Sequence, residues 1–213
     1  MTKEKILIVG GGFGGVKAAL ELADDDRFSV TLLTDHADLR YYPTLFHTAT
    51  GGTRSNASIS FDKLFADKKL TVHIDKATTI DLKAKLVTTE SGQTFEYDSV
   101  IFGLGVITNY FGIEGLKEFS FGIKSAEEAE RFKAHLHRQM LDDARPDLNY
   151  VIVGAGPTGI ELAGALPAYL KHIMKEHGLP QRKINITIVE ALPRLIPRMP
   201  KDVSRMVARR LRK

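Results

Sequence analysis

The sequence predicts an α/β protein with two similar units, each built around a parallel sheet covered in three layers. Three observations support this prediction. A strand, a glycine-rich turn and a helix follow one another near residue 10, and the same order returns near residue 154. The third observation is compositional, because 43% apolar and 26% charged residues over 213 positions are typical of a globular chain with a sizeable core.

The first unit begins with "KILIVGGGFGGVKAALELA", in which residues 6–9 predict a buried strand. Gly10, Gly12 and Gly15 then fit the spacing G-x-G-x-x-G. Apolar residues at helical spacing follow at Val16, Ala19, Leu20 and Ala23. A dinucleotide pyrophosphate must approach the backbone of such a turn closely, and N–H groups at the helix start then face the phosphates. Glycine has no side chain, so these three residues leave room for the pyrophosphate to approach the backbone.

The next strand supports the same interpretation. Residues 28–33 form a second apolar run that ends in Thr34 and Asp35, and Asp35 lies 20 residues after Gly15. A carboxylate at the carboxyl end of this strand can accept hydrogen bonds from ribose hydroxyls. Strand, turn, helix, strand and acid together favour a nucleotide site, whereas Asp35 by itself would be an ordinary solvated acid.

Three segments separate the two glycine turns. Residues 35–52 lack periodicity and predict a loop, with two alternatives left open: the lining of a site, or an ordinary packed connection. Residues 70–105 alternate in polarity, turn at 91–92 and end in a buried strand over 99–104, which predicts a β-meander that returns to the sheet. Residues 125–140 predict a helix, with Ser125 and Glu128 as a capping box. Its apolar stripe consists of Ala129, Phe132, Leu136 and Met140.

The second unit, "YVIVGAGPTGIELAG", repeats the pattern. Residues 151–153 predict the strand, Gly154, Gly156 and Gly159 the turn, and Ile160, Leu162 and Ala163 the start of the helix. Residues 184–189 predict the next strand, and Glu190 stands at its end, 31 residues after Gly159. Two such motifs in one chain indicate two Rossmann-like dinucleotide-binding units. The second unit is expected to be incomplete, because only two of its strands are clear.

Charge and residue usage exclude several function classes. The net charge of +4 equals the contribution of Arg209, Arg210, Arg212 and Lys213, so we expect a charged chain end and no nucleic-acid role. The chain has no cysteine, which removes thiol chemistry and cysteine-bound metals from these residues. The spacing of its seven histidines predicts no metal site.

The two glycine turns and the segment "TFEYDSVIFGLGVITNYFGIEG" from residue 94 to 115 together resemble type II NADH dehydrogenases, which are flavoprotein NADH:quinone oxidoreductases. The resemblance covers nearly the whole chain. It implies FAD on the first turn and NADH on the second, in a domain inserted into the first. It also implies hydride transfer from NADH to the flavin and electron transfer to a quinone.

The resemblance also implies site residues by position. Those for FAD are Gly10, Gly12, Phe13, Gly14, Gly15, Asp35, Thr44, Ala77, Gly103 and Gly105. Those for NADH are Gly154, Gly156, Pro157, Thr158, Gly159 and Glu190. Glu161 matches a family glutamate near the place where nicotinamide and flavin meet, although a helix-start acid favoured by the helix dipole is an equal alternative. Arg194 could neutralise the 2′-phosphate of NADPH, so we expect a preference for NADH that Arg194 reduces.

We expect an FAD-binding domain over 1–115, a helical connection over 116–145 that ends at Arg145 and Pro146, and an NADH-binding domain from 146 to 213. The family pattern continues beyond residue 213, so a fragment that binds FAD weakly is expected. Alternatives are another pyridine-nucleotide flavoprotein, such as a ferredoxin reductase or NADH oxidase, and a non-catalytic dinucleotide-binding module. We expect a cytoplasmic protein, or one that meets the cytoplasmic face of the membrane through a C-terminal region absent here. The resemblance leaves a homodimer open.

Overall fold

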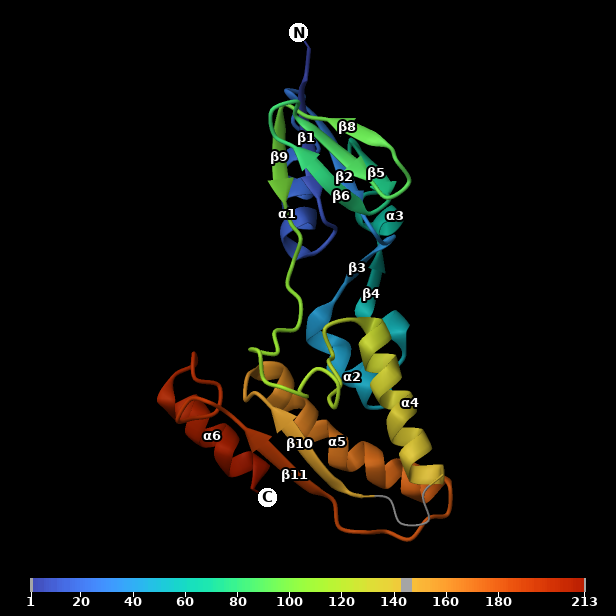
Figure 1. The fold of residues 1–213 in the computed structure, drawn as a ribbon, viewed down its shortest axis with the longest axis vertical. Helices are drawn as coiled ribbons and strands as arrows, with labels where there is room; N and C mark the ends of the chain where they lie inside the picture. Colours follow the sequence, from blue (N-terminus) through green and yellow to red (C-terminus); the bar gives the residue numbers. More distant parts are fainter. Residues whose placement is uncertain (1, 143–146, 213) are drawn as a thin grey trace. The chain divides into compact units, whose positions relative to one another are not determined.

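A computed structural model describes residues 2–142 and 147–212 of the chain. The structure divides into two compact units, each made of two chain segments (Figure 1). The first unit consists of Met1–Tyr41 and Ser58–Asn109, and the second of Tyr42–Ala57 and Tyr110–Lys213. Each unit contains one of the two glycine turns.

The first unit is built around a four-stranded parallel sheet in the order β5-β2-β1-β9. The central strand β1 (Glu4–Val9) pairs with β2 (Phe28–Thr34) on one side and β9 (Ser99–Phe102) on the other. Strand β5 (Leu70–Ile74) continues the sheet beyond β2. These runs are rich in β-branched and aliphatic residues because both faces of the sheet are covered.

Alternate side chains of β1 point to opposite faces of this sheet. Ile6 and Ile8 face a core that includes Val16 and Ala19 of helix α1 (Phe13–Leu22). Leu7 and Val9 face a second core with Val87 and Tyr97, on the side of an antiparallel sheet in the order β6-β7-β8. Helix, parallel sheet and antiparallel sheet form the predicted three layers, which confirms the fold class for this unit.

Strands β6 (Ala77–Asp81), β7 (Leu86–Thr89) and β8 (Thr94–Glu96) form the predicted meander. The prediction was wrong for the start of this region, because β5 belongs to the parallel sheet. Between residues 35 and 64 lie β3 (Asp38–Arg40), η1 (Tyr42–Thr44), α2 (Leu45–Ala49), η2 (Arg54–Ala57), β4 (Ser58–Ser60) and α3 (Phe61–Leu64). Strands β3 and β4 pair antiparallel.

The second unit contains the parallel pair β10 (Asn149–Val153) and β11 (Asn185–Val189). Helix α5 (Pro157–Glu176) joins the two strands, and α4 (Ala126–Asp142) and α6 (Lys201–Leu211) complete the unit. The predicted stripe of α4 is confirmed as core: Leu136 and Met140 are buried against side chains of α5. One half of the predicted capping box is present, because the Glu128 N–H donates to Ser125 Oγ at 3.1 Å. The Glu128 carboxylate accepts from the N–H of Lys124, at 2.6 Å, and not from that of Ser125.

The compact units differ from the expected domain boundaries of 115 and 145. Residues 42–57 belong to the second unit because α2 packs on α4, where Leu45, Ala57 and Ala126 form one buried cluster. The Lys133 ammonium also donates to the Gly52 carbonyl at 3.0 Å. Leu45 and Ala49 of this segment are buried and pack within the second unit. The expected junction at Arg145 and Pro146 lies outside the described residues.

Candidate dinucleotide sites

The first glycine turn joins β1 to α1, and its backbone is packed too closely for side chains. Gly10 has a φ of +107°, and a Cβ atom there would lie 2.4 Å from the carbonyl oxygen of Gly103 at the end of β9. A Cβ on Gly15 would lie 1.8 Å from the Gly10 carbonyl oxygen. The Gly10 N–H donates to the Leu33 carbonyl of β2 at 2.8 Å. The turn is therefore fixed between its two neighbouring strands.

The other side of this turn is open. No atom lies within 4 Å of a Cβ built on Gly14, and the nearest to one on Gly12 is 3.8 Å away. Gly12 is the N-cap of α1 and no side chain caps the helix. The first turn of a helix has N–H groups without intrahelical acceptors, and these attract anions. The clearance and the N–H groups together suit a phosphate group.

Asp35 lies where the sequence predicted it, directly after β2 at the carboxyl edge of the sheet. Its exposed carboxylate bonds to Nδ1 of His36. Ligands of open α/β folds bind outside this edge. The structure thus brings Gly10, Gly12, Asp35 and Gly103 to one edge.

Four further residues assigned to FAD lie in different settings. Phe13, at the start of α1, is 46% exposed and contacts the Tyr41 ring edge to face at a centroid distance of 5.7 Å. Gly105 has a φ of +71° and open space around it. Ala77 begins β6 and packs toward the core under the meander. Thr44 is the last residue of η1, which belongs to the second unit.

Sequence reasoning missed Thr34 and Phe61 in the first unit. Thr34 is 3% exposed and its hydroxyl has no hydrogen-bond partner among the described residues. A Cβ on Gly11 would lie 2.6 Å from this hydroxyl and 2.6 Å from the Phe61 ring, which explains the glycine between the two motif positions. No sequence signal links residue 61 to the turn, whereas Thr34 directly precedes the predicted acid.

The second glycine turn repeats the geometry of the first. Gly154 has a φ of +103°, and a Cβ on Gly159 would lie 2.1 Å from the Gly154 carbonyl oxygen. The Gly154 N–H donates to the Val189 carbonyl of β11 at 2.8 Å, as Gly10 does to β2. Gly156 is the N-cap of α5 and Pro157 the first helical residue, where its missing N–H costs nothing. Thr158 completes the first turn of α5.

Glu190 directly follows β11 and reaches back to this turn. Its carboxylate accepts hydrogen bonds from the N–H of Ala155 at 2.8 Å and of Leu192 at 2.9 Å. The backbone N–H of Leu192, followed by that of Ala155, holds the pKa of the Glu190 carboxyl below its ordinary value. Glu190 is therefore a carboxylate that is already oriented at the strand end.

Two other predicted residues of this unit differ in their contacts. Arg194 was expected to be available to a phosphate, but its guanidinium donates to the carbonyls of Met199, at 2.7 Å, and Pro197. Glu161, in the first turns of α5, has an exposed side chain.

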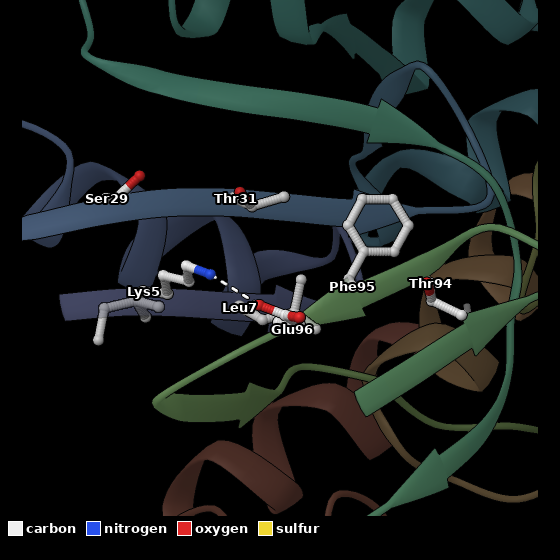
Figure 2. A pocket seen from close by; sticks show the side chains of 8 residues that line it. Lys5, Leu7, Ser29, Thr31, Thr94, Phe95 and Glu96 are labelled. Carbon is white, nitrogen blue, oxygen red and sulfur yellow. Dashed lines mark hydrogen bonds and ion pairs between the residues drawn. The ribbon is translucent and has the colours of Figure 1, made fainter. Parts of the chain in front are cut away.

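The structure also contains a shallow hollow of about 400 Å³ in the first unit, away from the glycine turns. Figure 2 shows it beside β1, β2 and β8, with the Lys5 ammonium bonded to the Glu96 carboxylate at 2.8 Å. Its lining residues Lys5 and Ser29 stand near the amino ends of β1 and β2, opposite the edge that carries Gly10 and Asp35. Over residues 2–142 and 147–212, no helix is long and apolar enough to cross a membrane.

Comparison with known proteins gives a family and several relatives. Residues 4–213 match the model of the pyridine nucleotide-disulphide oxidoreductases. The chain is 29% identical over 217 residues to a type II NADH:quinone oxidoreductase of Staphylococcus epidermidis, covering 94% of this chain and 52% of the relative. A protein of that name from Staphylococcus saprophyticus is 31% identical, with coverage of 92% and 51%. The chain thus spans about half the length of the curated relatives it matches.

Solved structures agree on the fold. NDH2 from Plasmodium falciparum in complex with NADH superposes with a TM-score of 0.82 at 21% identity, covering 99% of this chain and 46% of that one. A sulfide:quinone oxidoreductase from Aquifex aeolicus superposes with a TM-score of 0.74 at 25% identity, covering 97% and 49%.

Proposed function

Because the chain belongs to the pyridine nucleotide-disulphide oxidoreductase family, we propose that it forms the two dinucleotide sites of an FAD-dependent NADH:quinone oxidoreductase. The observation that carries this proposal is the pair of equivalent turns. In both turns, the last glycine of the motif packs on the carbonyl oxygen of the first glycine. In both, the helix that follows begins at the carboxyl edge of a parallel sheet, where its N-terminus is open. The relatives' names supply NADH as donor and quinone as acceptor.

The first turn fits the phosphates of FAD because it offers backbone without side chains. The clearance at Gly12 and Gly14 lets a pyrophosphate reach the N–H groups of the α1 start. Asp35 is the proposed acceptor for ribose hydroxyls, and Thr34 adds a buried hydroxyl that lacks a partner in the described structure. Phe13, Gly15, Gly103 and Gly105 shape this edge, while Thr44 and Ala77 remain assignments by resemblance.

The second turn is the proposed NADH site. Gly154, Gly156 and Gly159 let the nucleotide approach the start of α5, where Thr158 can donate its N–H and Pro157 cannot. Glu190 accepts from the ribose with lone pairs that its two backbone partners leave unused. Gly156 stands in open space, so nothing blocks that approach.

Bound FAD and NADH supply the hydride chemistry, and the protein supplies binding, orientation and exclusion of water. The Glu161 carboxylate is the proposed charged group near the reacting ends, because it stands exposed just inside the helix that begins at the second turn. The chain has no cysteine, so neither disulfide reduction nor thiol-dependent sulfide oxidation can be carried by these residues. We propose a peripheral place at the cytoplasmic face of the membrane, where quinone is available.

The test is an absorption spectrum of the purified chain. FAD is added, excess is removed, and NADH is then added without oxygen, followed by a water-soluble quinone. Because weak FAD binding is expected, we expect less than one flavin per chain to be retained, and we expect NADH to bleach the absorbance of that flavin and quinone to restore it. Retained flavin that NADH does not bleach would favour a non-catalytic dinucleotide-binding module. Reoxidation by ferredoxin but not by quinone would favour a ferredoxin reductase.

The matched variants for this test are Gly15→Ala and Gly164→Ala. The first places a methyl group against backbone and should abolish flavin retention, whereas the second places it in open space on α5, away from the residues assigned to FAD. Equal flavin retention by both variants would mean that FAD does not use the first turn.

A further inference from the structure

The two glycine turns are held in place by different devices. In the first unit the turn lies between two strands, with the Gly103 carbonyl of β9 packed against Gly10. In the second unit β10 has only β11 as a paired neighbour among the described strands, and no atom lies within 4 Å of a Cβ built on Gly154. Among the described strands, only β11 therefore borders the second turn, through the bond from the Gly154 N–H to the Val189 carbonyl.

Residues 190–199, which we call the strand-end loop, also hold the second glycine turn in place. Ala155 is fully buried in the centre of the turn, and both of its backbone groups bond to the loop. Its N–H donates to Glu190 Oε2 at 2.8 Å, and its carbonyl accepts from the Ile196 N–H at 2.8 Å. Both backbone groups of one residue of the turn are thus held by two residues of the loop that lie six positions apart.

The strand-end loop is itself ordered for this contact. Ile196 has a φ of +39°, which is unusual for a β-branched residue, and this backbone conformation goes with an N–H that reaches Ala155. The Arg194 guanidinium donates to the Pro197 and Met199 carbonyls and closes the loop. The Ser204 hydroxyl of α6 donates to the Leu195 carbonyl at 2.7 Å and anchors the loop from outside.

We propose that Glu190 and Arg194 are positioning residues of the second dinucleotide site, and that they act through the strand-end loop to hold the Ala155 backbone in the conformation that receives a nucleotide. The proposal rests on the function proposed above, since it assumes that this turn binds a dinucleotide phosphate. It assigns Glu190 a role beyond contact with ribose, and it assigns Arg194 to the loop instead of to the ligand.

A ligand without ribose hydroxyls separates the two roles of Glu190. The full 213-residue chain is labelled with ¹⁵N and titrated with ADP and with 2′,3′-dideoxy-ADP, and binding is followed at the amides of the second turn. If Glu190 acted only on the ribose hydroxyls, Glu190→Gln would weaken the binding of ADP but not that of dideoxy-ADP. We expect Glu190→Gln to weaken dideoxy-ADP as well, by about three- to tenfold, because the carboxamide NH₂ cannot accept the second backbone N–H.

Amide hydrogen exchange gives a readout that needs no ligand. We expect Glu190→Gln to speed exchange at Ala155 by tenfold or more, and Arg194→Ala to speed exchange at Ile196. Glu176→Gln is the matched control, because Glu176 is an exposed carboxylate of the same unit that pairs with His172. Glu176→Gln should change neither the amide exchange at Ala155 and Ile196 nor the affinity for ADP and dideoxy-ADP.

The outcomes distinguish this proposal from the proposed function. Unchanged exchange at Ala155 together with unchanged dideoxy-ADP affinity in Glu190→Gln would overturn the positioning role. If the unsubstituted chain binds neither nucleotide at this turn, the NADH site is wrong. The exchange measurement then still decides whether the loop holds the turn. Arg194→Ala retains the Glu190 carboxylate, so it tests the loop even if Glu190→Gln fails to fold.

Discussion

Gly15 packs directly on the backbone of Gly10, since a Cβ atom on Gly15 would lie 1.8 Å from the Gly10 carbonyl oxygen. Backbone cannot move aside as a flexible side chain can, so Gly15→Ala should separate α1 from the turn. We expect a loss of about 1–3 kcal/mol in the free energy of unfolding, as in overpacked cores. Urea unfolding followed by circular dichroism measures it.

Gly14→Ala is the control for this prediction, because it lies on the same helix with nothing within 4 Å of its Cβ. Replacing an exposed helical glycine by alanine gains up to about 1 kcal/mol. If Gly15→Ala were as stable as Gly14→Ala, the close packing of turn and helix would be refuted.

The apolar stripe of α4 gives a second prediction, on stability alone. Leu136 is fully buried in a cluster with Leu166 and Leu170 of α5, whereas Leu141 on the same helix is 47% exposed. Leu136→Ala should cost about 2–5 kcal/mol, because it removes buried methyl groups and leaves a cavity. Leu141→Ala should cost under about 1 kcal/mol. Thermal unfolding of both variants provides the comparison, and equal melting temperatures would contradict it.

The third prediction concerns the choice between NADH and NADPH. A 2′-phosphate would place about two negative charges beside the Glu190 carboxylate, so the dissociation constant should be higher for NADPH. Glu190→Gln should reduce the difference between the dissociation constants for NADPH and NADH. The Arg194 guanidinium is bonded to the Pro197 and Met199 carbonyls, so it cannot reach a phosphate without leaving them.

The measurement is the pair of dissociation constants by fluorescence titration, for the unsubstituted chain, Arg194→Ala and Arg198→Ala. We expect Arg194→Ala to change the NADPH to NADH ratio by less than about threefold, with Arg198→Ala as the matched control on the same loop. A tenfold selective loss of NADPH affinity in Arg194→Ala alone would show that its guanidinium binds the phosphate.

The pH dependence of stability gives a fourth prediction. The pKa of Glu190 is lower in the folded chain than its ordinary value of 4.5, because the backbone N–H groups of Leu192 and Ala155 favour the carboxylate. The unfolded state therefore binds the proton more tightly, and stability rises with pH through this window. The contribution is fully present above about pH 5 and is lost as the pH falls through the folded pKa.

Glu190→Gln removes this titration, and a protonated carboxyl resembles a carboxamide in having one carbonyl acceptor. The stability difference between the unsubstituted chain and Glu190→Gln should therefore shrink as the pH falls from about 5 to about 3. Urea midpoints measured across this range provide the check. A difference that stays constant with pH would mean that the carboxylate charge does not support the turn.

Local patterns predicted most of the regular structure. The apolar run before Gly10, the helical spacing after it and the acid after the next strand all lie within 35 residues, so their geometry follows from strand and helix periodicity. The same holds for the cap at Ser125 and the buried stripe of α4. The strand at 70–74 was assigned to the meander because alternation does not reveal whether a strand pairs parallel or antiparallel.

The sequence by itself determined that the chain has two strand, glycine turn and helix units, since only glycine permits the positive φ at Gly10 and Gly154 and the close packing at Gly15 and Gly159. Only the tertiary structure decided what surrounds each turn. Gly103 supports the first turn from 93 positions away, and α2 packs on α4 across a long insertion. The Glu190 carboxylate and the Ile196 N–H hold Ala155 because parallel strands bring their carboxyl ends to one edge. Such contacts join residues far apart in the chain, so short-range periodicity in the sequence does not predict them.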